Sequence, residues 1–185
     1  MKRNILMTFS LIAILAFTHS SCNKIKEAVK ATIGLKSADI EFTIPQITAT
    51  GPATIANKDV YLNVDSIIKA NNSKLNASNI RSVNIKSCTI TMLDGDASNN
   101  FSALNACKVD FSSNVNTNFY TLAEITNNPD VEAYTLEIPV NATVNFKDYF
   151  NATTFSYKIS GDARKTTSKD IHCKATIEYD LEAGL

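Results

Sequence analysis

Tryptophan is absent from this chain of 185 residues, and histidine occurs only twice. The lack of tryptophan removes the side chain that stacks most often on sugar rings, so that role would fall to tyrosine and phenylalanine. A surplus of basic residues is missing too, because lysine and arginine number 18 and aspartate and glutamate also number 18. With no basic surplus to neutralise phosphates, we expect no nucleic acid partner.

The sequence also has few histidines that could take part in catalysis. His19 lies in a segment that we expect to be removed, which leaves His172 as the only histidine of the mature chain. The alternation around His172 puts it on the polar face of the last strand, where a solvated side chain is the default. No nucleophile-elbow motif and no C-x-x-C pair occurs. We therefore expect no catalytic residue and no cofactor, with a glycan hydrolase that uses two carboxylates as the alternative.

One stretch has some of the features of a metal site. Residues 94–99 (DGDASN) place oxygen ligands at alternate positions, as calcium loops do. The stretch lacks the glycine of the sixth position and the acid of the twelfth, where Asn105 stands. Because a tight turn explains Asp94-Gly95 without a metal, we expect no metal site.

The N-terminus carries the pattern of a bacterial export signal. Basic residues at 2–3 precede an apolar run over 5–17, and small residues then lead to Cys22. The run is shorter than the roughly 20 apolar residues that span a bilayer. The ending resembles the lipobox of bacterial lipoproteins, although His19 replaces the usual leucine. This resemblance implies a signal peptide over 1–21 and a lipid on Cys22 that ties the protein to the membrane. The alternatives are ordinary secretion and an uncleaved anchor.

The rest of the chain divides into two segments. Removing residues 1–21 takes away two basic residues, which leaves 164 residues with 16 basic and 18 acidic side chains and a formal charge of −2. This length suffices for one domain with its own core. Apolar residues at helical spacing over 24–35 predict that residues 22–37 form a lipid anchor and a helical tether, with a helix packed on the sandwich as the alternative. From Ala38 the apolar period becomes two, so residues 38–185 are predicted to form a β domain.

Alternating apolar residues predict about eight strands in that domain. They are expected at 38–44, 60–64, 81–93, 103–112, 134–138, 140–146, 155–161 and 171–181. A short helix is expected at 67–70 with Asp65 as its N-cap. Twenty asparagines suit exposed strand faces and turns better than helices. With no helices at crossover positions, the pattern predicts a single antiparallel β-sandwich, immunoglobulin-like or jelly-roll-like.

The most specific tertiary prediction is a hairpin between 81–93 and 103–112. In the first of these strands the apolar positions shift by one residue, which predicts a β-bulge near 86–87. With that bulge, Cys88 lies opposite Cys107. Since an exported protein meets an oxidising compartment, these two cysteines are candidates for a disulfide, and the alternative is buried free thiols.

Three stretches of the mature chain, 22–27 (CNKIKE), 39–45 (DIEFTIP) and 60–67 (VYLNVDSI), resemble a group of small Bacteroidetes-type lipoproteins of unknown function. The resemblance implies a lipid-anchored β-sandwich at the outer membrane and brings no catalytic motif. Surface-exported lipoproteins of such bacteria carry an acidic run after the lipid cysteine, whereas Lys24 and Lys26 are basic, which favours the periplasmic side. We expect a non-catalytic envelope module that binds a glycan, a peptide or an envelope protein, or that has a structural role.

Overall fold

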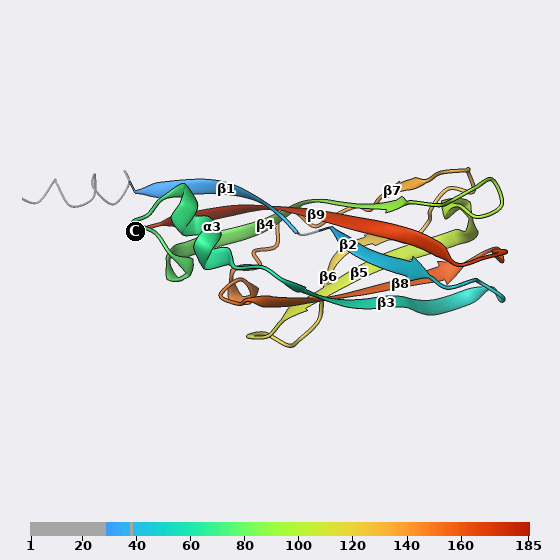
Figure 1. Ribbon diagram of the computed structural model, residues 1–185, viewed down its shortest axis with the longest axis horizontal. Helices are drawn as coiled ribbons and strands as arrows, with labels where there is room; N and C mark the ends of the chain where they lie inside the picture. Colours follow the sequence, from blue (N-terminus) through green and yellow to red (C-terminus); the bar gives the residue numbers. More distant parts are fainter. Residues whose placement is uncertain (1–28, 38) are drawn as a thin grey trace, which may run out of the picture.

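Nine strands form two antiparallel sheets in the part of the chain that the computed structural model describes, residues 29–37 and 39–185 (Figure 1). Sheet A consists of β1 (Lys30–Lys36), β2 (Ile40–Ile44), β4 (Ile80–Met92), β7 (Thr135–Glu137) and β9 (Ile171–Gly184). Sheet B consists of β3 (Gly51–Tyr61), β5 (Leu104–Ser113), β6 (Tyr120–Ile125) and β8 (Thr154–Ala163). Helix α3 (Val64–Asn71) lies at one end of the sandwich. The predicted antiparallel β-sandwich is confirmed.

The strand order identifies the kind of sandwich. β1 and β2 pair with successive parts of the same edge of β9, so they act as one strand that is interrupted between Lys36 and Ile40. Sheet A then runs β1/β2–β9–β4–β7 and sheet B runs β3–β8–β5–β6. This interleaved order of four strands in each sheet is that of a jelly roll, in which two Greek keys are wrapped together. Of the two predicted arrangements, the jelly-roll-like one is confirmed and the immunoglobulin-like one is wrong.

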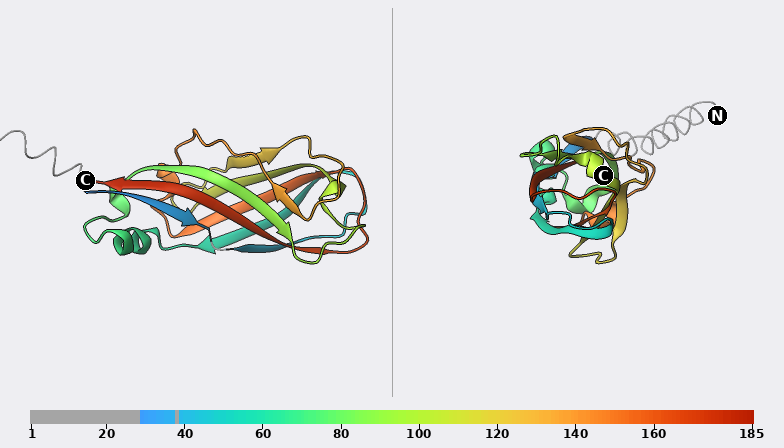
Figure 2. Two further views of the ribbon diagram at one scale, coloured as in Figure 1. Left: turned by 90° about the horizontal axis from the view of Figure 1, so that it is seen from above. Right: turned by 90° about the vertical axis from the view of Figure 1, so that its right-hand side faces the viewer.

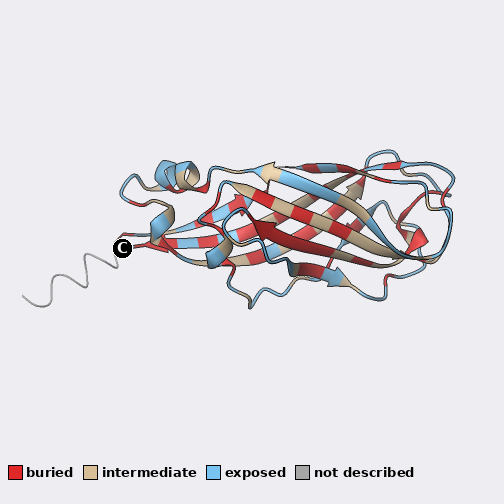
Figure 3. Ribbon diagram, turned by 90° about the horizontal axis from the view of Figure 1, so that it is seen from below, coloured by how far each residue is buried: buried red, intermediate tan, exposed pale blue. Residues whose placement is uncertain are grey.

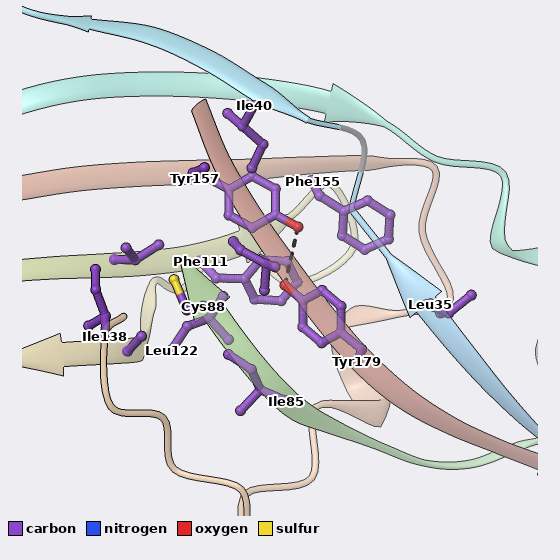
Figure 4. Packing of buried hydrophobic residues seen from close by; sticks show 14 of the residues in the cluster. Leu35, Ile40, Ile85, Cys88, Phe111, Leu122, Ile138, Phe155, Tyr157 and Tyr179 are labelled. Atoms are coloured by element: carbon purple, nitrogen blue, oxygen red, sulfur yellow. Dashed lines mark hydrogen bonds between the residues drawn. The ribbon is translucent and has the colours of Figure 1, made fainter. Parts of the chain in front are cut away.

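Apolar side chains fill the space between the sheets, with aromatic rings near its centre (Figure 4). Tyr157 of β8 and Tyr179 of β9 come from opposite sheets, and their buried hydroxyl oxygens lie 3.2 Å apart. Phe111 of β5 stacks on Phe155 with the ring centroids 5.8 Å apart. Because a buried hydroxyl needs a partner, the tyrosine pair ties the position of one sheet to that of the other.

β9 shows most clearly how the sequence produces these strands. Buried and more exposed residues alternate along it, as they do along other strands (Figure 3). Its predicted inward residues are each at most 1 % exposed: Ile171, Cys173, Ala175, Ile177, Tyr179 and Leu181. Apolar side chains at a period of two can bury one face of a strand while the polar face meets solvent.

The predicted hairpin between 81–93 and 103–112 is wrong. The first segment is β4 in sheet A and the second is β5 in sheet B, and β4 pairs with β9 and β7 instead. The predicted bulge is nevertheless present, because Ile85 lies opposite Tyr179 and Ser87 opposite Glu178, which leaves Lys86 as the extra residue. Alternation states which face of a strand is buried but not which strand lies beside it. All the strand connections cross between the sheets except β1–β2 and β5–β6.

The helical tether predicted over 24–35 is wrong for the residues that the structure describes. Lys30–Lys36 is β1, and residues 22–28 of the predicted anchor and tether lie outside the described part. The inward residues of β1 lie opposite apolar residues of β9, with Ile33 against Leu181 and Leu35 against Tyr179. The sandwich therefore includes residues that were assigned to the tether, and it does not begin at residue 38.

Other predicted boundaries also change. Segment 140–146 forms no strand and instead lies along β4, where Val83 N–H donates to Asn145 Oδ1 at 3.0 Å. The strand β6 was not predicted. The helix is longer than expected, and its N-cap is Asn63, whose side chain accepts from Ser66 N–H at 3.0 Å. Asp65 accepts instead from the backbone of Ala77 at 2.9 Å.

The two ends of the elongated molecule differ (Figure 2). One end carries the start of β1, helix α3 and the C-terminus, where Leu185 N–H donates to Val29 O at 3.2 Å. The opposite end carries the β4–β5 and β8–β9 connections. The first described residue and the last residue of the chain therefore lie together, far from these connections.

Candidate functional site

An open groove of about 720 Å³ lies beside β6, at the edge of sheet B. One wall is Phe119–Glu124, and the other is the segment Pro139–Asn141 that follows β7. The walls are joined where Glu124 N–H donates to Pro139 O at 3.0 Å and where Ala123 and Val140 form an isolated bridge. The junction fixes the segment after β7 against the edge of β6.

Two aromatic rings line this groove and remain exposed to solvent. Phe119 is 53 % exposed and Tyr120 is 39 % exposed. The ring of Tyr120 packs edge-on against buried Phe146, with centroids 5.4 Å apart, so the core supports it from one side. Exposed aromatic rings that are held in place are typical of binding surfaces.

A second, shallow hollow of about 370 Å³ lies on the outer face of sheet B. The strand register places a row of polar residues across all four strands of this sheet. That row is Thr54, Ser160, Lys108 and Glu124. The row beside it is Pro52, Asp162 and Ala106. Glu124 lines both this hollow and the groove, so the two meet at this residue.

The outer face of sheet B is rich in hydrogen-bonding groups. Asp110 accepts from Thr121 Oγ1 at 2.8 Å and pairs with Lys108 Nζ at 3.1 Å. Asp59 accepts from Ser156 Oγ at 2.6 Å. The outward charged residues are Lys108, Lys158, Asp59, Asp110, Glu124 and Asp162. Two cations against four anions give this face a formal charge of −2.

A third pocket, of about 300 Å³, lies near the start of β3 under the β2–β3 connection. None of its lining residues is charged. The connection above it is fixed by a double hydrogen bond, in which Ile47 N–H donates to Thr167 Oγ1 at 2.8 Å and Thr167 N–H donates to Ile47 O at 2.9 Å. This pocket has neither exposed aromatic rings nor ionised groups with which to orient a polar ligand.

The predicted site residues do not come together at the groove. Cys22, the predicted lipid site, lies outside the described residues. Cys88, Cys107 and Cys173 are buried free thiols in the structure, which is the alternative to the candidate Cys88–Cys107 disulfide. Its basis was the hairpin, whereas Cys88 belongs to sheet A and Cys107 to sheet B. Burial raises the pKa of each of these thiols to about 12.

His172 lies on the solvent side of β9 as predicted, but it has a partner. Its Nδ1 lies 2.6 Å from Asp94 Oδ2, and its backbone N–H donates to Asp94 Oδ1 at 2.8 Å. The hydrogen bond from His172 lowers the pKa of the Asp94 carboxyl. Lys169 pairs with Asp96 at 3.0 Å, so both acids of the suspected calcium loop pair with side chains of the β8–β9 region. Within residues 29–37 and 39–185, no group of three or more His, Cys, Asp or Glu residues is arranged to hold a metal ion.

Sequence reasoning missed the groove because β6 was not recognised. The available signal was the adjacent pair Phe119-Tyr120 after an asparagine-rich loop, since two aromatic residues in sequence cannot both point into the core of a strand. Among the described residues, no helix has the length and apolar character needed to cross a bilayer.

No protein-family model and no curated protein matches the chain. Similar solved structures include that of the infectious bursal disease virus Gx strain, with a TM-score of 0.38 and 10 % identity over 84 % of this chain and 32 % of that chain. The VP2 subviral particle of the same virus has a TM-score of 0.36 and 7 % identity over 84 % and 33 %. The cyanophage Pam1 capsid has a TM-score of 0.33 and 12 % identity over 82 % and 86 %. The chain spans about a third of the bursal disease virus chains, and we assign the jelly roll from the strand order alone.

Proposed function

We propose that the protein is a lipid-anchored component of the bacterial cell envelope and that its sandwich is a non-catalytic binding module. The observation that carries this proposal is the groove beside β6, in which exposed Phe119 and Tyr120 lie next to polar groups. Exposed aromatic side chains beside a few polar groups are the usual composition of a recognition site.

The lining of the groove favours binding over hydrolysis. Of its nine lining residues, Glu124 is the one carboxylate. A glycan hydrolase of the usual kind needs two carboxyl groups about 5–10 Å apart on either side of the bond that is cleaved. We therefore place the two-carboxylate hydrolase second to a binding module.

The attachment to the membrane rests on the lipobox-like Cys22. Seven peptide steps separate Cys22 from Val29, so the end of the sandwich that carries α3 and the C-terminus would lie within about 25 Å of the lipid. The basic residues Lys24 and Lys26 favour the periplasmic face of the outer membrane over the cell surface. In this location the module would bind a glycan, a peptide or an envelope protein.

The proposal is tested with the full chain in detergent, screened against glycan and peptide arrays and against purified envelope proteins. Phe119→Ala and Tyr120→Ala should each weaken binding of whichever probe is found. Tyr61→Ala is the matched control, because Tyr61 is 68 % exposed and is not a lining residue of the groove. Equal losses in all three variants would contradict a site at the groove. Turnover of a bound glycan that Glu124→Gln abolishes would replace the binding module by the hydrolase.

A further inference from the structure

We infer that the groove beside β6 and the hollow on the outer face of sheet B are two parts of one binding surface for a neutral oligosaccharide, joined at Glu124. This inference rests on the proposed function and names the ligand class for the same site. Glu124 lines both the groove and the hollow, and its row continues through Lys108 and Ser160 to Thr54 on β3.

The two parts offer the two kinds of contact that a sugar chain needs. A sugar ring has an apolar C–H face, which packs on aromatic rings such as those of Phe119 and Tyr120. Its hydroxyl groups both donate and accept, so they pair with carboxylates, hydroxyls and ammonium groups. The hollow supplies these from Glu124, Asp162, Lys108, Ser160 and Thr54.

An added peptide strand fits this surface less well. Strand addition needs a regular edge with free backbone N–H and C=O groups. The edge of β6 is already bonded to Pro139 at Glu124, and a register shift at Leu122 interrupts the ladder next to it. On the outer face of sheet B the backbone groups belong to the ladders between strands, so the side chains are what a ligand meets.

The charge of the outer face of sheet B favours neutral sugar chains over acidic ones. The outward residues of sheet B carry a formal charge of −2, and Glu124 is the one charged residue of the groove. Like charges repel, so uronic-acid, sulfated or phosphorylated glycans are disfavoured on this face. A neutral sugar chain avoids that repulsion, and its hydroxyl groups still donate charge-assisted hydrogen bonds to the carboxylates and accept them from Lys108.

The test measures binding of the full chain in detergent to neutral hexasaccharides of glucose, mannose and xylose, and to a galacturonic acid hexasaccharide. At least one neutral chain should bind more than tenfold tighter than the acidic one. Phe119→Ala should weaken that binding roughly three- to tenfold through lost stacking. Glu124→Gln should weaken it roughly tenfold through lost charge-assisted hydrogen bonds.

A further variant tests the hollow separately. Ala106 lies opposite Asp162 on the outer face, so Ala106→Leu fills the hollow without touching the core. It should weaken binding of a hexasaccharide but leave binding of a disaccharide unchanged. Tyr61→Ala and Glu41→Gln are the matched controls, because neither residue lines the groove or the hollow, and both variants should bind as the unaltered chain does.

Each alternative outcome has a distinct meaning. Hexasaccharide binding that is unaffected by Ala106→Leu would overturn the joined surface. Preference for the galacturonic acid chain would overturn the assignment to neutral ligands. Groove-dependent binding of a peptide or protein with no sugar binding would overturn this inference and leave the proposed binding function intact. Absence of any groove-dependent binding would overturn both.

Discussion

The hydroxyl groups of Tyr157 and Tyr179 show how a single polar atom can affect the stability of a buried core. Each residue is at most 3 % exposed, and each hydroxyl has the other as its partner at 3.2 Å. Burial raises the pKa of both Tyr157 and Tyr179, so both stay neutral and able to donate. The pair therefore replaces two hydrogen bonds to water by one bond between the sheets.

Removing one hydroxyl of this pair should destabilise the fold by more than half of what removing both hydroxyls does. Tyr179→Phe leaves the Tyr157 hydroxyl buried without a partner, and we expect the free energy of unfolding to fall by about 1–3 kcal/mol. The double variant Tyr157→Phe, Tyr179→Phe should be less destabilised than the sum of the single variants, because no polar group is then stranded. Denaturant unfolding of the four proteins measures this coupling, and strictly additive changes would show that the two hydroxyls do not depend on each other.

A second prediction at this scale concerns acid. The hydrogen bond from His172 lowers the pKa of Asp94 below its ordinary value of 3.8. A carboxyl with a lowered folded-state pKa stabilises the fold above the unfolded value, and this contribution is lost as the pH falls through the folded value. In His172→Ala the Asp94 pKa, followed by NMR titration of the side chain, should rise toward 3.8. Lys169→Ala is the control and should mainly raise the pKa of Asp96, whose largest lowering comes from Lys169. An unchanged Asp94 titration in His172→Ala would show that the contact does not persist in solution.

At the scale of the element, the bulge in β4 shows how one residue keeps two apolar sets on one face. Ile85 and Cys88 are three residues apart and both buried, which a regular strand would not allow. The extra residue Lys86 takes up the difference, because Ser87 follows Ile85 directly in the ladder with β9. The bulge lies between two well-paired halves of a strand of 13 residues.

Two single-residue deletions in β4 test separately whether the fold needs the bulge itself or the pattern of inward-facing residues. Deleting Lys86 leaves Ile85, Ser87 and Cys88 in regular alternation, so we expect a loss of about 1 kcal/mol, a typical cost for a single change. Deleting Thr89 also regularises the ladder, but it turns Cys88 outward and Ser87 into the core. Burying that hydroxyl should add about 1–3 kcal/mol. Thermal and denaturant unfolding give the comparison, and equal losses would mean that the bend at the bulge, rather than the pattern, is what the fold needs.

The elements also show which parts of the structure the sequence can reveal. The inward set of β9 was predictable because alternation is local and nearly perfect from Ile171 to Leu181. The strand β1 was missed because its apolar residues fit two periods: Val29 and Ile33 fit a helix, while Ile33 and Leu35 fit a strand. Pairing with β9, some 150 residues away in the sequence, decides in favour of the strand. Pairing partners and the groove depend on connections that cross between sheets, and a short-range pattern does not encode them.

At the scale of the whole molecule, the proposed attachment to the membrane depends on a single sulfur atom, that of Cys22. If Cys22 carries the lipid, Cys22→Ser should lose acyl labelling and membrane association while the sandwich still folds. Ser21→Ala is the matched control and should keep both, because a small residue remains before the cysteine. Labelling with a clickable fatty acid, followed by fractionation, makes the comparison. Membrane association that survives Cys22→Ser would indicate a retained signal segment as the anchor.

Such an anchor would make β1 the mechanical link between the membrane and the rest of the protein. If a ligand holds the sandwich while the membrane moves away from it, the pulling force is applied at Val29 and acts along the axis of β1. The hydrogen bonds to β9 run across that axis over the seven paired positions of β1, so the force shears them together instead of peeling them one at a time. Resistance to extraction is then set by the rate of forced unfolding of this ladder, a property separate from equilibrium stability.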